Sequence, residues 1–283
     1  MKLQDIFNRL ILMAILLQHC GISHAEQTIQ PIRFGSVAMD TPRLMHQRLL
    51  PLTQYLAQEL GRPVELVLAP NMPAAINDVA TGNVELAYLT PVAYLRSKQM
   101  SNTQLIVKTV TNNEASFKLM IVVRDDSSIQ KIEDLAGKRF AFGDPAALLQ
   151  RAVVVGAGIN LDALGRYEFL DHYDNIVRGV LHRDFDAGIL KDTMAYKWKD
   201  KGIRILYSSE ELPPYNITAA SHVDNELLER IRKAFLKLNI KQVGHQEIIK
   251  ALDPNYTGFA ATNDEEYDIV RMLTKPFANP DQQ

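Results

Sequence analysis

The sequence predicts an α/β protein built from two lobes, and three observations lead to this fold class. Short runs rich in β-branched residues alternate with segments of helical periodicity along the 283 residues, which is typical of βαβ units and a mainly parallel sheet. Residues 84–89 and 185–190 share acidic, small and apolar positions at a constant spacing of 101 residues, although any two βα units can look alike. No linker rich in Gly, Ser or Pro separates the halves, so we expect strands to join the lobes.

The first 25 residues predict a secretory signal peptide rather than a part of the fold. Lys2 and Arg9 precede the short apolar block 10–17, and residues 23–25 (SHA) supply the small residues of a cleavage site. This apolar block is far shorter than the about 20 residues that a membrane span needs. We therefore expect the leader to be removed by cleavage near Ala25.

Cys20 is the only cysteine of the sequence, and it lies within this leader. The bulky polar residues Gln18 and His19 precede it where a lipid-attachment site has small ones, so lipidation of Cys20 is the less favoured alternative. Without the leader, the mature chain has no thiol for a disulfide, a metal site or a nucleophile.

The charge balance gives no support to nucleic-acid binding. The formal net charge is −2, and removal of Lys2, Asp5 and Arg9 with the leader leaves 29 basic and 32 acidic residues, or −3. No basic block stands out, and we therefore expect no nucleic-acid partner.

The helices of the first half are identified by their spacing and their ends. Leucines recur at helical spacing in residues 43–60, and Gly61 stops that helix. A shorter helix over residues 73–81 ends at Gly82, and Pro91 opens another. The strands expected here are residues 31–38, 64–69, 84–89, 104–111 and 116–124.

The second half repeats this alternation. Residues 128–145 indicate a short helix, a glycine turn, a strand and a loop, and residues 147–157 are helical. A long amphipathic helix is expected over residues 225–239, with shorter helices near 244–251 and 264–274. The strands expected here are residues 167–170, 185–190, 203–207 and 216–221, with helices between them.

This order predicts the boundaries of the lobes. We expect residues 26–120 and 208–283 to form the first lobe and residues 121–207 to form the second. The strand over 116–124 would cross between them, and the chain would cross back after residues 203–207.

The strand at 84–89 ends at Thr90 and Pro91, where a helix begins at once. Thr90 can cap this helix, and Pro91 fits the first helical position. Free N–H groups at such a helix start, at the carboxyl edge of an open α/β sheet, form a site for an anion or a carbonyl group. Tyr94 would add a hydroxyl one turn later, but a pure cap at Thr90 and pure packing at Tyr94 stay open.

Polar residues after other expected strands give further candidates for a ligand site. Asp192 follows the second copy of the pattern, where it either caps a helix or binds an ammonium or hydroxyl group. Asp144, His172, Tyr173 and Tyr215 lie in other edge loops, a position that favours function. A structural role is an equal alternative for each of them.

Motifs of enzymes and metal sites are missing from the sequence. It has no GxSxG elbow, no Walker loop and no HExxH, and its histidines lack the spacing of metal ligands. We expect no catalytic residue, no metal and no cofactor.

Six stretches of the mature chain carry a family resemblance. They are IRFGSVAMDTP (32–42), LLPLTQYLAQELGRPVEL (49–66), TGNVELAYLTPVAYL (81–95), SFKLMIVVRDDSSIQKIEDLAGKRFAFGDP (116–145), AGINLD (157–162) and DFDAGIL (184–190). In these stretches the chain resembles the PhnD-like family, the periplasmic substrate-binding proteins of phosphonate, phosphite and phosphate ABC importers.

The resemblance implies a type II periplasmic-binding-protein fold, with two mixed sheets flanked by helices and a hinged cleft that closes on a ligand. It implies a periplasmic monomer that takes a small-molecule ligand and has an ABC permease as its partner. Thr90 stands where the family usually has glycine, and Met72 where it has tyrosine. Asp144 and Asp192 fall on acidic positions of the family, and Met39 completes the candidate set.

The sequence departs from the family after Asp144. The family generally has a Ser-Thr-Ser-Gly-Tyr loop there, whose hydroxyls and amides hold the phosphonate oxygens. This chain lacks about four residues of that loop, and each lost bond to an ionised group is worth about 1.5–3 kcal/mol. We therefore expect no phosphonate binding of the usual kind. The residues in place of the hydroxyls are Ala146, Ala147, Leu148 and Leu149.

Three functions remain in order of preference. The first is a solute-binding protein that delivers a small polar ligand to an ABC permease. The second is a ligand sensor that acts on a membrane receptor or kinase through the same two lobes. An enzyme on this fold comes last, because it would need a catalytic acid, base or cofactor-binding lysine in the cleft.

Overall fold

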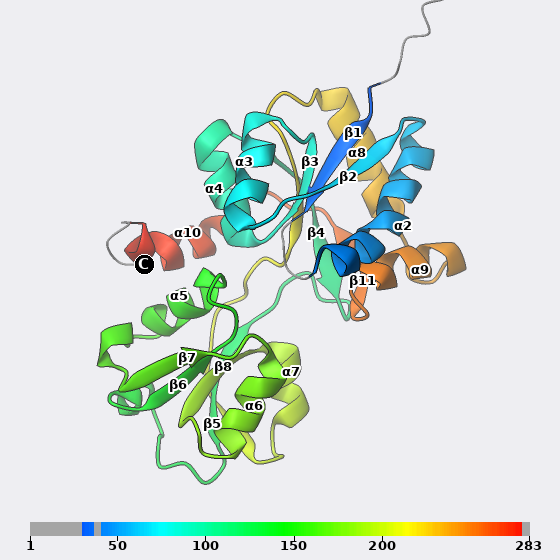
Figure 1. The fold of residues 1–283 in the computed structure, drawn as a ribbon. Coiled ribbons are helices and arrows are strands. Elements are labelled where there is room, and N and C mark those ends of the chain that lie inside the picture. Colours follow the sequence, from blue (N-terminus) through cyan, green and yellow to red (C-terminus); the bar gives the residue numbers. More distant parts are fainter. Residues whose placement is uncertain (1–29, 37–40, 279–283) are drawn as a thin grey trace, which may run out of the picture. The chain divides into compact units, whose positions relative to one another are not determined.

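The computed structural model describes residues 30–36 and 41–278 (Figure 1). The predicted signal peptide and the candidate ligand residue Met39 lie outside the described residues.

The first sheet has six strands in the order β11-β4-β10-β3-β1-β2. The strand β1 runs parallel to both of its neighbours, whereas β10 runs antiparallel to β3 and β4. The strands are β1 (Ile32–Ser36), β2 (Val64–Leu68), β3 (Leu86–Leu89), β4 (Gln104–Thr111), β10 (Asn216–Ala219) and β11 (Tyr256–Ala260).

The second sheet has five strands in the order β7-β6-β8-β5-β9. The strand β6 runs parallel to β7 and β8, whereas β5 runs antiparallel to β8 and β9. The strands are β5 (Leu119–Arg124), β6 (Arg139–Phe142), β7 (Arg166–Phe169), β8 (Ala187–Lys191) and β9 (Ile203–Ser208).

Both sheets are therefore mixed, as the family resemblance implies, and the simpler expectation of a mainly parallel sheet is wrong. The chain passes directly from one sheet to the other twice, from β4 to β5 and from β9 to β10. The strands that it enters in this way, β5 and β10, are antiparallel to their neighbours. Only a helical crossover within one sheet forces the next strand to be parallel. The strand β11 was not expected, because Gly258, with φ of 155°, interrupts a short apolar run.

Helices flank both sheets (Figure 1). Their ends follow the predicted signals: Gly61 and Gly82 close α2 and α3 with φ of 60° and 78°. The α-helices are α2 (Pro42–Leu60), α3 (Met72–Thr81), α4 (Pro91–Ser101), α5 (Leu148–Gly156), α6 (Tyr173–Leu181), α7 (Asp192–Trp198), α8 (Asn225–Lys237), α9 (Val243–Leu252) and α10 (Asp268–Thr274). Four short 3₁₀ helices are η1 (Ile132–Leu135), η2 (Leu161–Ala163), η3 (Glu265–Tyr267) and η4 (Lys275–Phe277).

The strand β5 shows why its sequence is apolar without alternation. Leu119, Ile121 and Val123 pack in one cluster with α5, while Met120 and Val122 pack in another with α6 and α7. Successive side chains of a strand point to opposite faces, so a strand covered on both faces is apolar at every position. This fits the interior position of β5, which lies between β8 and β9 in the second sheet.

The last helices contact both cores. Tyr267 is buried in the cluster of the first sheet, whereas Val270 is buried in the cluster of the second. Phe277 packs with Leu148 and Ala152 of α5. The predicted assignment of residues 208–283 to the first lobe therefore stays a prediction.

Across residues 30–36 and 41–278, none of the helices combines the length and the apolar character that a membrane crossing requires.

Candidate functional site

Thr90 lies at the junction of β3 and α4 and caps the helix, as its sequence position predicts. Its backbone is extended, and its hydroxyl accepts a hydrogen bond from the N–H of Ala93 at 3.2 Å. Pro91 occupies the first turn, where the missing N–H costs nothing. The half-buried Thr90 side chain is therefore held by the helix that it starts, and a ligand contact there stays a prediction.

Tyr94 is fully buried one turn after Thr90. Its hydroxyl donates to Asp264, and its ring packs edge-on against Tyr267 with 4.9 Å between ring centroids. Burial and the hydrogen bond to Asp264 raise the pKa of Tyr94 well above its usual range. The hydroxyl is satisfied inside the protein, which supports the packing role, and a ligand role for Tyr94 stays a prediction.

Asp192 links the start of α7 to the segment that leads into β5. Its carboxylate accepts the N–H of Lys118 at 2.8 Å and the N–H of Thr193 at 2.7 Å. The side chain is half-buried. A ligand would share these oxygens with two backbone donors, and that role stays a prediction.

Asp144 begins the loop between β6 and α5. The exposed carboxylate accepts the N–H of Ala146 at 2.7 Å, and the Asp144 carbonyl accepts the N–H of Ala147 at 2.9 Å. Both bonds belong to a local turn, which is the usual behaviour of Asp at such a position.

The start of α5 carries apolar side-chain contacts. Ala147 occupies the cap position without a capping side chain. Leu148 is only 7% exposed and packs with Ala152 and Phe277, and Val92 of α4 packs against the same cluster. Residues 145–149 therefore offer no side-chain hydroxyl to an oxyanion.

Gln150 is a buried polar residue of this junction that the sequence did not single out. Its side-chain oxygen accepts the N–H of Gly143 at 2.8 Å, and its amide donates to the Tyr173 hydroxyl at 3.4 Å. Burial raises the pKa of Tyr173 to about 12, and the charge of Asp192 adds to this effect. His172, just before Tyr173, is exposed at the start of α6 and does not cap the helix with its side chain.

Three tyrosines come together where the chain re-enters the first sheet. Tyr215 stacks on Tyr88 with 5.2 Å between ring centroids, and the hydroxyls of Tyr88 and Tyr256 lie 2.6 Å apart. Burial raises the pKa of Tyr215 above its usual range, and the nearby Tyr173 and Asp144 contribute. The predicted residues Tyr215, Tyr173 and Asp144 therefore lie within electrostatic range of one another.

Lys191 adds a cation next to Asp192. Its amino group lies 5.3 Å from the centroid of the Phe117 ring. Burial lowers the pKa of Lys191, and the charges of Asp192 and Asp253 oppose this effect. Lys191 was not among the predicted site residues, although its position at the end of a strand was a usable signal. Tyr88, Asp253 and Tyr256 also belong to this neighbourhood, and no sequence pattern pointed to any of them.

Met72 opens α3 and packs partly buried against the core of the first sheet. The helix is capped by Asn71, whose side-chain oxygen accepts the N–H of Ala74 at 2.9 Å. Nothing in this arrangement brings Met72 to the tyrosines, and its ligand role stays a prediction.

The neighbourhood thus combines phenol hydroxyls, carboxylates and one amine, a set suited to hydrogen bonds with a small polar ligand. In the part of the chain that the structure describes, no three His, Cys, Asp or Glu side chains gather as a metal would require.

The family of the chain follows from comparison with known proteins. A family model described as "ABC transporter, phosphonate, periplasmic substrate-binding protein" matches residues 34–267. The chain belongs to this family. It is thus a periplasmic substrate-binding protein of the phosphonate type of ABC transporter, in a family of binding proteins and not of enzymes.

Two curated relatives agree with this assignment. The phosphate-import protein PhnD of Mycolicibacterium smegmatis is 24% identical over 251 residues, which cover 79% of this chain and 78% of that protein. The phosphonates-binding periplasmic protein of Escherichia coli is 24% identical over 269 residues, covering 89% of this chain and 78% of the relative.

Solved structures confirm the predicted fold. PhnD1 from Prochlorococcus marinus, in complex with methylphosphonate, has a TM-score of 0.69 at 18% identity and covers 87% of this chain and 97% of its own. A binding protein component of an ABC phosphonate transporter from Pseudomonas aeruginosa has a TM-score of 0.65 at 18% identity, covering 86% and 85%. The fold is thus the type II periplasmic-binding-protein fold that the resemblance implied.

Proposed function

We propose that this protein captures a small polar ligand in a cleft between its two lobes and delivers it to an ABC permease. The family assignment supports the transport role. The grouping of Tyr215, Tyr173, Asp144 and Lys191 around the crossing segments supports a polar ligand. Closure about the crossing segments would commit the ligand for handover.

The ligand of this protein is not a phosphonate bound in the family's usual way. The observation that carries this proposal is Leu148, which begins α5 and packs on Phe277 and Val92 where the family generally has hydroxyls. Loss of two bonds of about 1.5 kcal/mol or more weakens Kd at least about a hundredfold.

Calorimetric titration of the mature protein with methylphosphonate, phosphite and phosphate tests this proposal. We expect no binding in the micromolar range to any of the three. Micromolar binding to one of them contradicts the argument from the missing hydroxyls and leaves the transport role standing.

A thermal-shift screen of small metabolites and oxyanions would identify the ligand. A compound present at 100 times its Kd stabilises the folded state by about 2.7 kcal/mol. Substitution of Tyr215 or Tyr173 by Phe should reduce the shift of a true cleft ligand, because each variant removes one phenol hydroxyl and keeps the ring. A hit that both variants leave unchanged binds elsewhere.

We further propose that the leader is cleaved near Ala25. The apolar block over residues 10–17 and the small residues that follow support this. N-terminal sequencing of exported protein tests it, and a lipid-modified Cys20 as the first residue would contradict it.

A further inference from the structure

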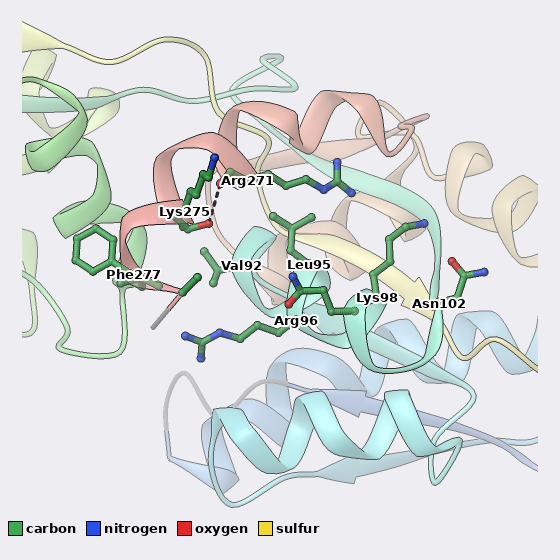
Figure 2. Close-up of a pocket in the computed structure, with 12 residues that line it drawn as sticks. Val92, Leu95, Arg96, Lys98, Asn102, Arg271, Lys275 and Phe277 are labelled. Carbon is green, nitrogen blue, oxygen red and sulfur yellow. Dashed lines mark hydrogen bonds between the residues drawn. The ribbon is translucent and has the colours of Figure 1, made fainter. Parts of the chain in front are cut away.

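A pocket outside the proposed ligand site lies between α4, the segment α10–η4 and the first residue of α5 (Figure 2). Its volume is about 660 Å³, within the range of about 300–1,000 Å³ found for small-molecule sites. Of the residues that the sequence predicted for the cleft, none lines this pocket.

The charged side chains that line the pocket are all basic. Figure 2 shows Arg96 and Lys98 on α4, and Arg271 and Lys275 on the red segment. Lys98 and Arg271 pair with Asp264, which lies outside the lining, at 3.7 and 2.6 Å. Within residues 30–36 and 41–278, Arg96 and Lys275 take part in no ion pair. The pocket therefore carries a positive charge that the protein does not neutralise.

The rest of the lining is partly apolar. Leu148 and Phe277 are buried in one cluster, and Val92 packs against it. Gln99 and Asn102 add amide groups at the exposed side. A compound that fits this lining has an apolar body for the cluster and an anionic group for the cations.

We propose that this pocket binds a small amphipathic organic anion, such as an aromatic or aliphatic carboxylate. The anionic group lies between the unpaired cations, and the hydrocarbon body lies on Val92, Leu148 and Phe277. The pocket shares Val92, Leu148 and Phe277 with the start of α5 but none of the predicted cleft residues, so its anion does not depend on the ligand proposed above.

The probe for this site is 2-naphthoate, with 2-naphthol as the neutral ring and acetate as the charge without a ring. Calorimetry on the mature protein should show binding of 2-naphthoate that is stronger than that of either control by about tenfold or more. Binding should weaken as salt rises, because added ions screen the exposed cations. Equal binding of 2-naphthol would overturn the anionic character of the site.

Two variants locate the site. Arg96→Glu combined with Lys275→Glu should weaken 2-naphthoate binding by about tenfold or more, because it reverses two charges that have no structural partner. Gln99→Trp should also weaken it by filling the open side with an indole ring.

The matched control is Lys233→Glu combined with Lys241→Glu, which makes the same charge change at exposed positions of α8 and the loop before α9. It should change binding less than about twofold, since distant surface charges are screened. If this control weakens binding as much as the pocket variant, or if neither the pocket variant nor Gln99→Trp weakens it, the pocket is not the site. Thermal unfolding of each variant checks that the fold is kept.

Discussion

Arg33 donates three hydrogen bonds to the carboxylate of Glu85, two from its guanidinium and one from its backbone N–H. Arg139 binds Asp186 in the same way in the other sheet. In each pair the arginine lies at the start of one strand, β1 or β6, and the carboxylate lies just before its parallel neighbour, β3 or β8. The repeat at 101-residue spacing therefore marks equivalent positions in two similarly built sheets.

The first prediction concerns the stability that the Arg33–Glu85 pair contributes. Glu85→Gln should lower the free energy of unfolding at pH 7 by about 1–2 kcal/mol, because the Glu85 side chain is only 16% exposed and its charge holds Arg33. Urea denaturation measures the change. The control Glu247→Gln, at an exposed position of α9, should change stability by less than about 0.5 kcal/mol. An equal loss of unfolding free energy in both variants would contradict a stabilising role for the Arg33–Glu85 pair.

The second prediction is the pH dependence of the stability difference between the parent protein and Glu85→Gln. Burial opposes ionisation of Glu85, but the hydrogen bonds and charge of Arg33 outweigh it, so its pKa is lowered in the folded state. A lowered pKa contributes stability that is fully present above the unfolded value of about 4.3 and is lost as pH falls through the folded value. The stability gap between the parent protein and Glu85→Gln should thus be constant from pH 7 to about pH 5 and shrink below about pH 4. A gap that widens in acid would contradict this sign.

The sequence predicted the fold well because its signals were local. Gly61, Gly82 and Pro91 fixed helix ends through their own backbone preferences, and the all-apolar run of β5 followed from its two covered faces. The direction of β5 and β10 was missed because it depends on how the chain passes between sheets, which no local pattern records.

The candidate site was predicted only in part. Thr90 acts as a cap because that role depends on the residues next to it. The partner of Tyr94 is Asp264, which lies 170 positions later in the chain, and no local pattern connects them. Gln150 was missed for a related reason, since an amide in an apolar helix shows its role only when Gly143 and Tyr173 are placed around it.

The third prediction concerns the contact between Tyr94 and Asp264. Asp264→Ala should lower the free energy of unfolding by about 2–3 kcal/mol, because it leaves the buried Tyr94 hydroxyl without an acceptor. Asp264→Asn keeps an acceptor and should cost less. The control Asp268→Ala removes the exposed carboxylate that also pairs with Arg271, and it should cost less than about 1 kcal/mol. A denaturant midpoint for Asp268→Ala that lies at or below that of Asp264→Ala would contradict this assignment.

The fourth prediction tests the packing of α6 on the second sheet. A Cβ at Gly188 would overlap the side chain of Ile176, which is fully buried and has no room to move, and would lie 3.3 Å from the Ala141 carbonyl oxygen. Gly188→Ala should therefore cost about 1–3 kcal/mol by overpacking. Gly244→Ala in α9 faces open space, and it should leave stability unchanged or raise it by up to about 1 kcal/mol. Thermal unfolding distinguishes the two, and a neutral Gly188→Ala would contradict the close approach.

The last prediction is a gain of function at the start of α5. Insertion of Ser-Thr-Ser-Gly between Pro145 and Ala146 would add the length and the hydroxyls that the family resemblance predicts to be missing there. We expect the insertion to strengthen methylphosphonate binding relative to the parent protein in calorimetry, because each new charge-assisted bond contributes about 1.5–3 kcal/mol.

A control insertion of Ala-Ala-Gly-Gly at the same place separates hydroxyls from loop length. It should bind no methylphosphonate, because it lengthens the loop and frees Leu148 without adding a side-chain donor. If both insertions fold and both bind, backbone N–H groups at the helix start are sufficient, and the absent hydroxyls are not what keeps this protein from binding phosphonate. If both fold and neither binds, the cleft differs from the family in more than this loop.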